Sequence, residues 1–206
     1  MAIRACIRSD NDGMAPIGNK DKLRSDVSGG SVLAEGRIQR RLTAILAADV
    51  VGYSQLMEMD EARTVQDLKA HQAVLLPTVS EFGGRIINIA GDGILAEFAS
   101  AVQAVECAVA IQKTMPERNA AVEKARRMQL RVGVNIGDVI FDEASVYGDG
   151  INVAARLEGI AEPGGICVSE DAYRQTRGKV SVEFTDIGEQ KSQEHRTACA
   201  CLQGRA

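Results

Sequence analysis

The feature that most constrains the fold is residues 85–98, two short and largely apolar runs joined by Gly91-Asp92-Gly93. The runs are Ile86–Ile89 and Ile94–Phe98. Apolar β-branched runs around a short Gly/Asp turn predict a β-hairpin. Asp92 at the tip has two interpretations. It only makes the turn, or it presents a carboxylate in fixed geometry to a hard cation such as Mg²⁺.

Composition limits the class of protein. A chain of 206 residues is long enough for one buried domain with extensions, and 45% hydrophobic and 25% charged residues are typical of a soluble globular protein. A net charge of −4 without a basic block, and only 3% aromatic residues, argue against a nucleic-acid partner. No apolar run reaches the length of a membrane span, and the N-terminus has no signal-peptide core. We therefore expect a cytoplasmic protein.

The cysteines indicate neither a disulfide framework nor a zinc site. They number five, they are scattered, and the chain has only two histidines, His71 and His195. This pattern fits a reducing compartment.

The chain divides into three parts. Residues 1–38 show no sustained period, and we expect a disordered extension, with Met14 as an alternative start. Residues 39–190 form the predicted domain. Residues 191–206 have neither apolar alternation nor a strand pattern, and we expect a disordered tail.

Hydrophobic periodicity predicts an α+β domain, with an antiparallel or mixed sheet covered by helices on one face. Ser54 is the expected cap of a first helix, and Pro77 is expected to kink or split the next one. The expected strands are 42–49, 86–89, 94–98, 128–141, 166–169 and 180–187, and the expected helices are 60–81, 100–115, 148–159 and 170–175.

Three groups of residues carry candidate chemistry. Asp49 and Asp92 each follow an apolar strand, so both carboxylates can meet a cation at the sheet edge. Residues 50–54 place a glycine beside amides at a helix start, which is a weak signal for an anion site. Asn152 and Arg156, spaced i and i+4, share one helix face; they either grip a phosphate and a ribose or form a solvated polar surface.

Together these residues resemble the catalytic domain of class III nucleotidyl cyclases, the adenylate and guanylate cyclases, and in particular the bacterial soluble type. The resemblance runs from about residue 40 to 190. The motifs that carry it, in order, are Ala48-Asp49-Val50-Val51-Gly52-Tyr53-Ser54, Gly91-Asp92-Gly93, Arg131-Val132-Gly133-Val134-Asn135-Ile136-Gly137 and Tyr147-Gly148-Asp149-Gly150-Ile151-Asn152-Val153-Ala154-Ala155-Arg156, followed by Ala161–Gly165.

The resemblance implies a ferredoxin-like fold that dimerises head to tail. It further implies that Asp49 and Asp92 hold two Mg²⁺ or Mn²⁺ ions per site, that the Val50 carbonyl reaches a metal, and that the amides of Gly52 and Tyr53 meet the phosphates. One ion would lower the pKa of the ribose 3′-hydroxyl of the nucleoside triphosphate. That oxygen would then attack the α-phosphate in line as pyrophosphate leaves.

The resemblance also implies that one active site uses two chains. Asn152 of the partner chain would orient the ribose, and Arg156 of the partner chain would stabilise charge on the α-phosphate. A monomer should therefore be inactive.

Two base-reading positions depart from the family pattern. A Lys usually stands four residues before the second metal-binding Asp, and an Asp or Thr seven before the Asn; here these are Asn88 and Ser145. Both side chains can donate to and accept from a base edge. Neither matches the pair associated with guanylate cyclases, so we favour ATP over GTP, with looser selectivity.

The C-terminus departs as well. After residue 190 the family continues into a basic strand, whereas this chain reads KSQEHRTACACLQGRA. We hypothesise a shifted reading frame, because codons can be chosen such that a one-base shift yields Asn-Ile-Ala-Arg-Pro-Ala-Arg-Val-Tyr-Arg. We then expect one strand to be missing and its neighbour to be left as an open edge.

Two functional classes follow. The first is a homodimeric adenylate cyclase, with guanylate cyclase as a variant. The second is a catalytically weak or silent cyclase-like module that binds nucleotide and dimerises.

Overall fold

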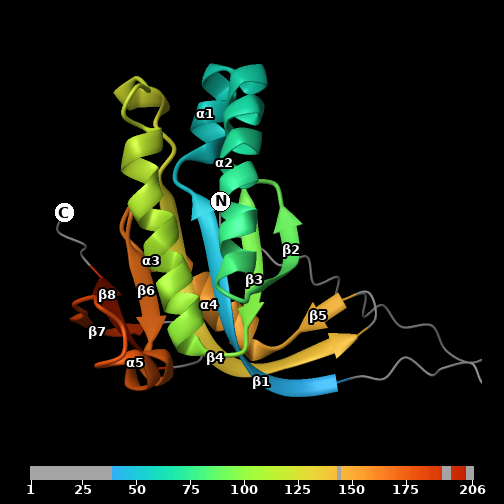
Figure 1. Ribbon diagram of the computed structural model, residues 1–206, viewed down its shortest axis with the longest axis vertical. Coiled ribbons are helices and arrows are strands. Elements are labelled where there is room, and N and C mark those ends of the chain that lie inside the picture. The colour runs from blue at the N-terminus through green and yellow to red at the C-terminus, as the bar shows by residue number, and fades with distance from the viewer. Residues whose placement is uncertain (1–38, 143–144, 192–195, 203–206) are drawn as a thin grey trace, which may run out of the picture.

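The computed structural model describes residues 39–142, 145–191 and 196–202. Within these residues one mixed sheet has the strand order β2-β3-β1-β4-β6-β8-β7, and β5 pairs with β4 (Figure 1). Among the strands of the described ranges, only β4 and β6 pair in parallel. The strands are β1 Gln39–Val50, β2 Arg85–Ala90, β3 Gly93–Phe98, β4 Leu130–Asp142, β5 Ser145–Tyr147, β6 Ile166–Ser169, β7 Thr185–Lys191 and β8 Arg196–Leu202. The predicted α+β class is confirmed.

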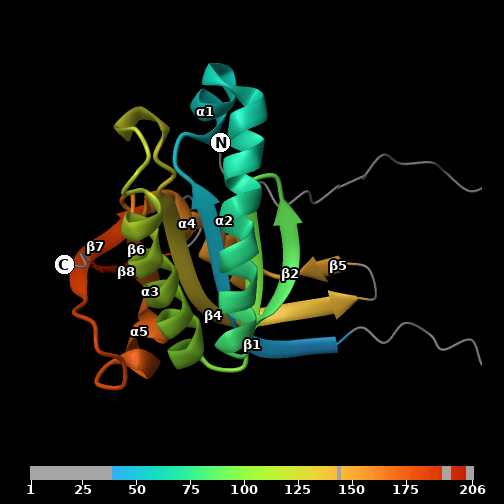
Figure 2. The same ribbon diagram turned by 45° about the horizontal axis from the view of Figure 1, so that its top comes forward.

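The helices lie on both faces of the sheet, as Figures 1 and 2 show. They are α1 Tyr53–Met59, α2 Glu61–Glu81, α3 Ala101–Arg118, α4 Asp149–Ile160, α5 Glu170–Thr176 and the short 3₁₀ helix η1 Lys124–Arg126. One face of the sheet packs against α1, α2, α3 and α5, and the other packs against α4. The expectation of helices on one face only is therefore wrong. The reason lies in β1, whose last eight residues are all buried, because a strand buried on both faces needs cover on both.

Helix α4 lies against the backbone of β4. Gly133 and Gly137 face the helix, and Asn135 between them donates from Nδ2 to the Gly150 carbonyl at 3.0 Å. A Cβ on Gly133 would lie 2.1 Å from the Ala154 carbonyl oxygen, which is far inside van der Waals contact. The two glycines of the β4 motif therefore allow the close approach of α4.

Prolines do not break the long helices. Helix α2 continues through Pro77, so the expected split of this helix is wrong, and α3 continues through Pro116 to Arg118. A proline inside a helix costs about 3 kcal/mol. In α2 the burial of Leu75 and Val79, on either side of Pro77, offsets this cost.

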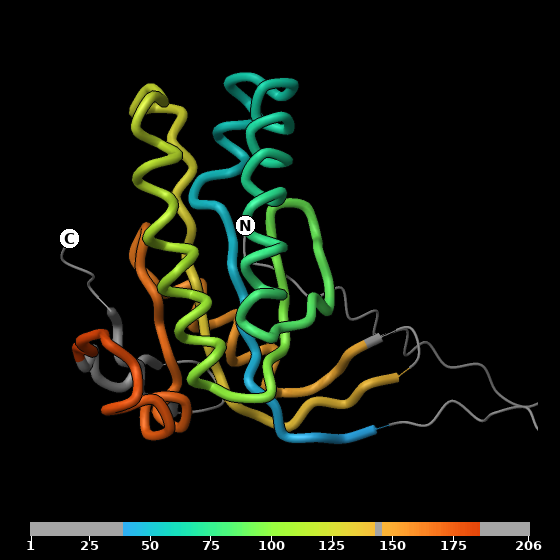
Figure 3. The backbone as a smooth tube through the Cα atoms, in the orientation of Figure 1, coloured from blue at the N-terminus to red at the C-terminus, as the bar shows by residue number. Residues whose placement is uncertain are grey.

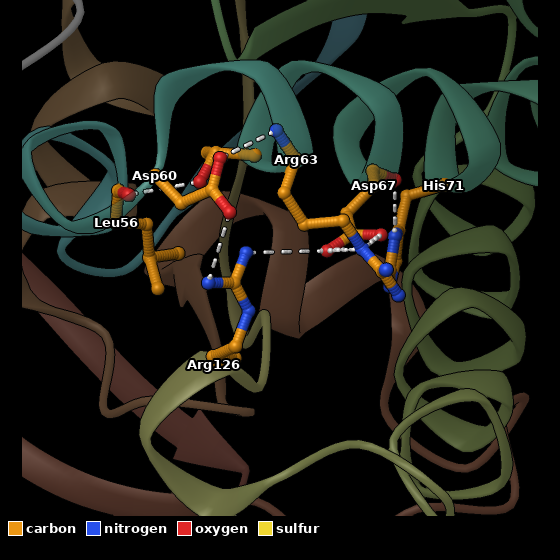
Figure 4. A network of polar contacts seen from close by, with 7 residues as sticks. Leu56, Asp60, Arg63, Asp67, His71 and Arg126 are labelled. Atoms are coloured by element: carbon orange, nitrogen blue, oxygen red, sulfur yellow. Dashed lines mark hydrogen bonds and ion pairs between the residues drawn. The ribbon is translucent and has the colours of Figure 1, made fainter.

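A polar network joins the connection between α3 and β4 to α2 (Figure 4). Arg126 of η1 reaches Asp60 and Asp67 at 3.8 and 3.9 Å, and Asp60 also accepts from the Arg63 amide as the N-cap of α2. These contacts hold the end of the molecule where β1 runs into α1.

The C-terminal strands differ from the prediction. The segment predicted as a strand from 180 to 187 packs Val180, Val182 and Phe184 against the core, but the strand β7 begins at Thr185. Strand β8 pairs with β6 and β7, so the expectations of no strand in 191–206 and of an open edge beside it are both wrong. The backbone hydrogen bonds that β6 and β7 offer to this segment favour a strand there despite the weak local pattern. Residues 1–38 and 203–206 lie outside the described residues.

Candidate active site

The end of β1 and the tip of the β2–β3 hairpin meet at one end of the sheet, as the trace in Figure 3 shows. The predicted hairpin is present, and Asp92 lies in its turn. Asp49, one residue before the end of β1, is 3% exposed. The Oδ2 of Asp92 accepts from the amide of Val50, the residue after Asp49, at 3.3 Å, and the charge of Asp49 influences the pKa of Asp92. The structure thus brings the two predicted carboxylates together.

The carboxyl pair carries unfavourable negative charge. Burial, together with the side chain and the charge of Asp49, raises the pKa of Asp92 to about 7, although the Val50 amide opposes this shift. Two adjacent carboxylates cannot both ionise cheaply without a nearby cation. The pair is therefore suited to a positive ligand.

Arg131 and Glu158 extend the cluster. Arg131 of β4 lies directly opposite Asp49 in the sheet, and its Nη2 is 3.2 Å from Asp49 Oδ2. Its Nε is 3.1 Å from Oε1 of Glu158, a residue of α4 that is 0% exposed. Burial, followed by the charge of Asp49, raises the pKa of Glu158 to about 7, while Arg131 opposes this shift.

Sequence reasoning did not single out Arg131 or Glu158 as site residues. The available signal was a charged residue in each of two apolar patterns, since Arg131 precedes Val132-Gly133 and Glu158 follows Leu157. Neither pattern predicts which charged side chains form ion pairs in the folded protein.

The start of α1 lies beside the carboxyl pair. Gly52 adopts a left-handed conformation at φ 66° and occupies the N-cap position, so the predicted cap at Ser54 is wrong. Burial and then the charge of Asp92 raise the pKa of the Tyr53 phenol. Amides at the start of a helix have no partner within it and favour anions.

Asn152 and Arg156 lie on α4, away from its buried stripe. Asn152 is half-buried and Arg156 is exposed. Within the described part of the chain, Arg156 makes no ion pair. Its charge is therefore available to a group outside this chain.

The base-reading candidates lie on two different strands. Asn88 is exposed on β2 opposite Leu95, next to a bulge. Ser145 begins β5 and pairs with Asp142.

A separate polar cavity of about 560 Å³ lies beside the N-terminus of α4. Arg40, Asp138, Asp149 and Glu170 are among its lining residues. Neither Asp49 nor Asp92 lines it. This cavity is therefore distinct from the carboxyl pair.

The donor set fits a hard divalent cation shared with a ligand. Among the described residues no three His, Cys, Asp or Glu side chains form a complete metal cage. Mg²⁺ typically binds through one or two carboxylates and completes its shell with waters and substrate phosphates. Asp49 and Asp92 meet this requirement, because a bound cation would stabilise the ionised form of the pair, which the raised pKa of Asp92 shows to be unfavourable in its absence.

Comparison with known proteins agrees with this geometry. Residues 39–200 match the family described as adenylate and guanylate cyclase catalytic domain. The chain therefore belongs to this family.

Individual relatives give the same assignment. A putative adenylate cyclase of Rhizobium meliloti is 47% identical over 157 residues, which cover 76% of this chain and 27% of that protein. An adenylate cyclase of Streptomyces coelicolor is 31% identical over 135 residues, covering 65% of this chain and 34% of that protein. The chain thus spans about a third or less of these relatives.

A solved structure matches along its whole length. The adenylate/guanylate cyclase/hydrolase from Silicibacter pomeroyi is 40% identical with a TM-score of 0.77, covering 82% of this chain and 100% of that one. The fold is therefore that of a cyclase domain.

Proposed function

We propose that this chain is the catalytic domain of an adenylate cyclase, which converts ATP into 3′,5′-cyclic AMP and pyrophosphate. The observation that carries the proposal is the hydrogen bond from the amide of Val50, the residue after Asp49, to the Asp92 carboxylate, which brings the two carboxylates together in a chain of the cyclase family. Several relatives are also named adenylate cyclases.

Asp49, Asp92 and the Val50 carbonyl would hold two Mg²⁺ or Mn²⁺ ions. Bound there, the ions supply positive charge that lowers the pKa of the ribose 3′-hydroxyl and stabilises the leaving pyrophosphate. The amides of Gly52 and Tyr53 bind and orient the phosphates. The 3′-oxygen forms a bond to the α-phosphorus and the α–β P–O bond breaks; pyrophosphate leaves with the electron pair, and the hydroxyl proton passes to solvent.

The second half of the site comes from a partner copy of the chain. The exposed Arg156, which has no ion pair within the described residues, would stabilise charge on the α-phosphate of the partner's nucleotide. Asn152, on the same helix face, would orient the ribose. A homodimer with sites at its interface is therefore part of the proposal.

The selectivity for the nucleotide base is part of the same proposal. Asn88 and Ser145 would read the base, with ATP preferred over GTP.

No helix among the described residues is long and apolar enough to cross a bilayer. We propose a cytoplasmic location, without nucleic-acid or membrane partners.

The test is production of cyclic AMP by the purified protein with Mn²⁺ and ATP. Asp92→Ala should abolish the product, whereas Asp171→Ala, which removes an exposed carboxylate on α5, should leave it unchanged. If the wild type makes no more product than Asp92→Ala does, the result would instead support a silent nucleotide-binding module. Parallel assays with GTP separate the two cyclase activities.

A further inference from the structure

Arg131 connects the carboxyl pair to helix α4. Its guanidinium lies 3.2 Å from Asp49 through Nη2 and 3.1 Å from Glu158 through Nε. We propose that Glu158 is a positioning residue that holds Arg131 and so links cation binding at Asp49 and Asp92 to the position of α4. The cation itself rests on the proposed function.

The burial of Glu158 argues for a specific role. The side chain is 0% exposed, and among the described residues neither of its carboxyl oxygens has a hydrogen bond of good geometry. A buried carboxylate in this state is costly, and an apolar side chain of similar size would pack at lower cost. Its favourable contact among the described residues is the ion pair with Arg131. The charge at this position therefore serves Arg131 rather than the core.

The path from Arg131 to the helix is rigid. A Cβ on Gly133, two residues after Arg131, would lie 2.4 Å from the Glu158 amide nitrogen, so the backbones of β4 and α4 are in direct contact. Arg131 Nη1 also donates to the Gly159 carbonyl at 3.4 Å. A shift of the guanidinium is therefore passed to the C-terminal half of α4 without a deformable layer between them.

Cation binding provides the shift. A divalent cation and the Arg131 guanidinium compete for the same Asp49 carboxylate, which is only 3% exposed. When a cation takes Asp49, Glu158 is the remaining anionic partner for the guanidinium. The Arg131 guanidinium then interacts more strongly with Glu158 on α4 and less with Asp49.

This relationship has a consequence for the proposed dimer. Asn152 and Arg156 lie on the same helix as Glu158 and would serve the partner's site. Cation binding in one site would therefore alter the position of residues that complete the other. The two active sites would be coupled.

The first test measures binding of Mn²⁺ alone, by the electron paramagnetic resonance signal of the free ion. Glu158→Gln leaves the charge of Arg131 unbalanced beside the carboxyl pair, and we expect Mn²⁺ to bind about tenfold more weakly. Glu106→Gln removes an exposed charge from α3 and should not change binding. Glu158→Asp, which keeps the charge, should recover part of the affinity and covers the case in which the Gln variant does not fold. The proposal is overturned if a folded Glu158→Gln protein binds Mn²⁺ as tightly as the wild type does. It is also overturned if Glu158→Asp binds Mn²⁺ as weakly as a variant without the charge.

The second test follows hydrogen–deuterium exchange in α4 with and without Mn²⁺. In the wild type we expect Mn²⁺ to change exchange in residues 152–158, and in Glu158→Gln we expect this change to be lost. No response of α4 in the wild type overturns the link. Both readouts are independent of catalysis: a wild type that passes them but makes no cyclic nucleotide refutes the proposed function alone, and an active enzyme that fails them refutes this inference alone.

Discussion

The Cα of Gly150 lies 2.7 Å from the point where a side chain on Gly137 would begin. The N-terminal turn of α4 therefore lies directly on β4, with no side chain between them. Gly133 makes the same kind of contact further along the helix. These contacts set the distance between the strand that carries Arg131 and the helix that carries Asn152, Arg156 and Glu158.

Substitution of Gly133 should destabilise the protein strongly. In Gly133→Ala the new methyl would lie 2.1 Å from the Ala154 carbonyl oxygen, and relief requires α4 to move. We expect a loss of about 3 kcal/mol in the free energy of unfolding, measured by urea denaturation. Gly159→Ala is the control, since no atom within 4 Å opposes a Cβ there, and we expect it to stabilise by about 0.5–1 kcal/mol. Equal stability of the two variants would contradict the contact.

Asp92→Asn should abolish activity but stabilise the metal-free protein. The pKa of Asp92 rises from 3.8 to about 7 on folding, so its charge opposes folding. That opposition is absent below pH 3.8, grows as pH rises toward 7, and is complete above it. With solvent screening of this partly exposed group, we expect a gain of about 1 kcal/mol at pH 8, or about 2–4 °C in melting temperature.

The measurement is a melting curve with EDTA at two pH values, about 4 and about 8. The difference between Asp92→Asn and the wild type should be present at the higher pH and vanish at the lower one. A variant that melts below the wild type at both would show that Asp92 does not carry unfavourable charge.

Complementation in trans should distinguish the two halves of the site. Asp92→Ala and Arg156→Ala should each lose about a hundredfold or more in activity as homodimers. An equal mixture, unfolded and refolded together, should recover about one quarter of the wild-type activity, because half of the dimers then contain one intact site of two. No recovery in a mixture that forms heterodimers would place both residues in the same chain's site.

Lysine at position 88 should sharpen base selectivity. Asn88 is exposed, so Asn88→Lys should fold normally. We expect the ratio of kcat/KM for ATP over GTP to rise by about tenfold. Ile89→Lys adds the same charge at the next exposed position of β2, and it should leave the ratio unchanged. If Asn88→Lys also leaves it unchanged, residue 88 does not read the base.

Cys107 should be chemically inert in the native protein. It is fully buried in α3, and burial raises the pKa of its thiol to about 12. Only the thiolate reacts readily, so we expect no alkylation of Cys107 by iodoacetamide until the protein unfolds, measured by peptide mass spectrometry. Labelling at the rate of an exposed thiol would contradict the burial of α3.

Local pattern determined a large part of this structure. The hairpin around Asp92, the buried strand that ends at Asp49 and the helix with Asn152 and Arg156 all follow from periodicity and turn residues. Together with the motif order, they also determined the family. These features depend on contacts between residues that are near in sequence.

Only the tertiary structure decided which charges meet and which faces are covered. The meeting of Asp49 with Arg131 depends on the pairing of β1 with β4, and the burial of Glu158 depends on α4 packing at Gly133. Strand β8 likewise forms because β6 and β7 offer it hydrogen bonds, although its own residues show little strand pattern. Sequence periodicity tells which face of an element is buried, but the partner across that face is chosen by packing of the whole chain.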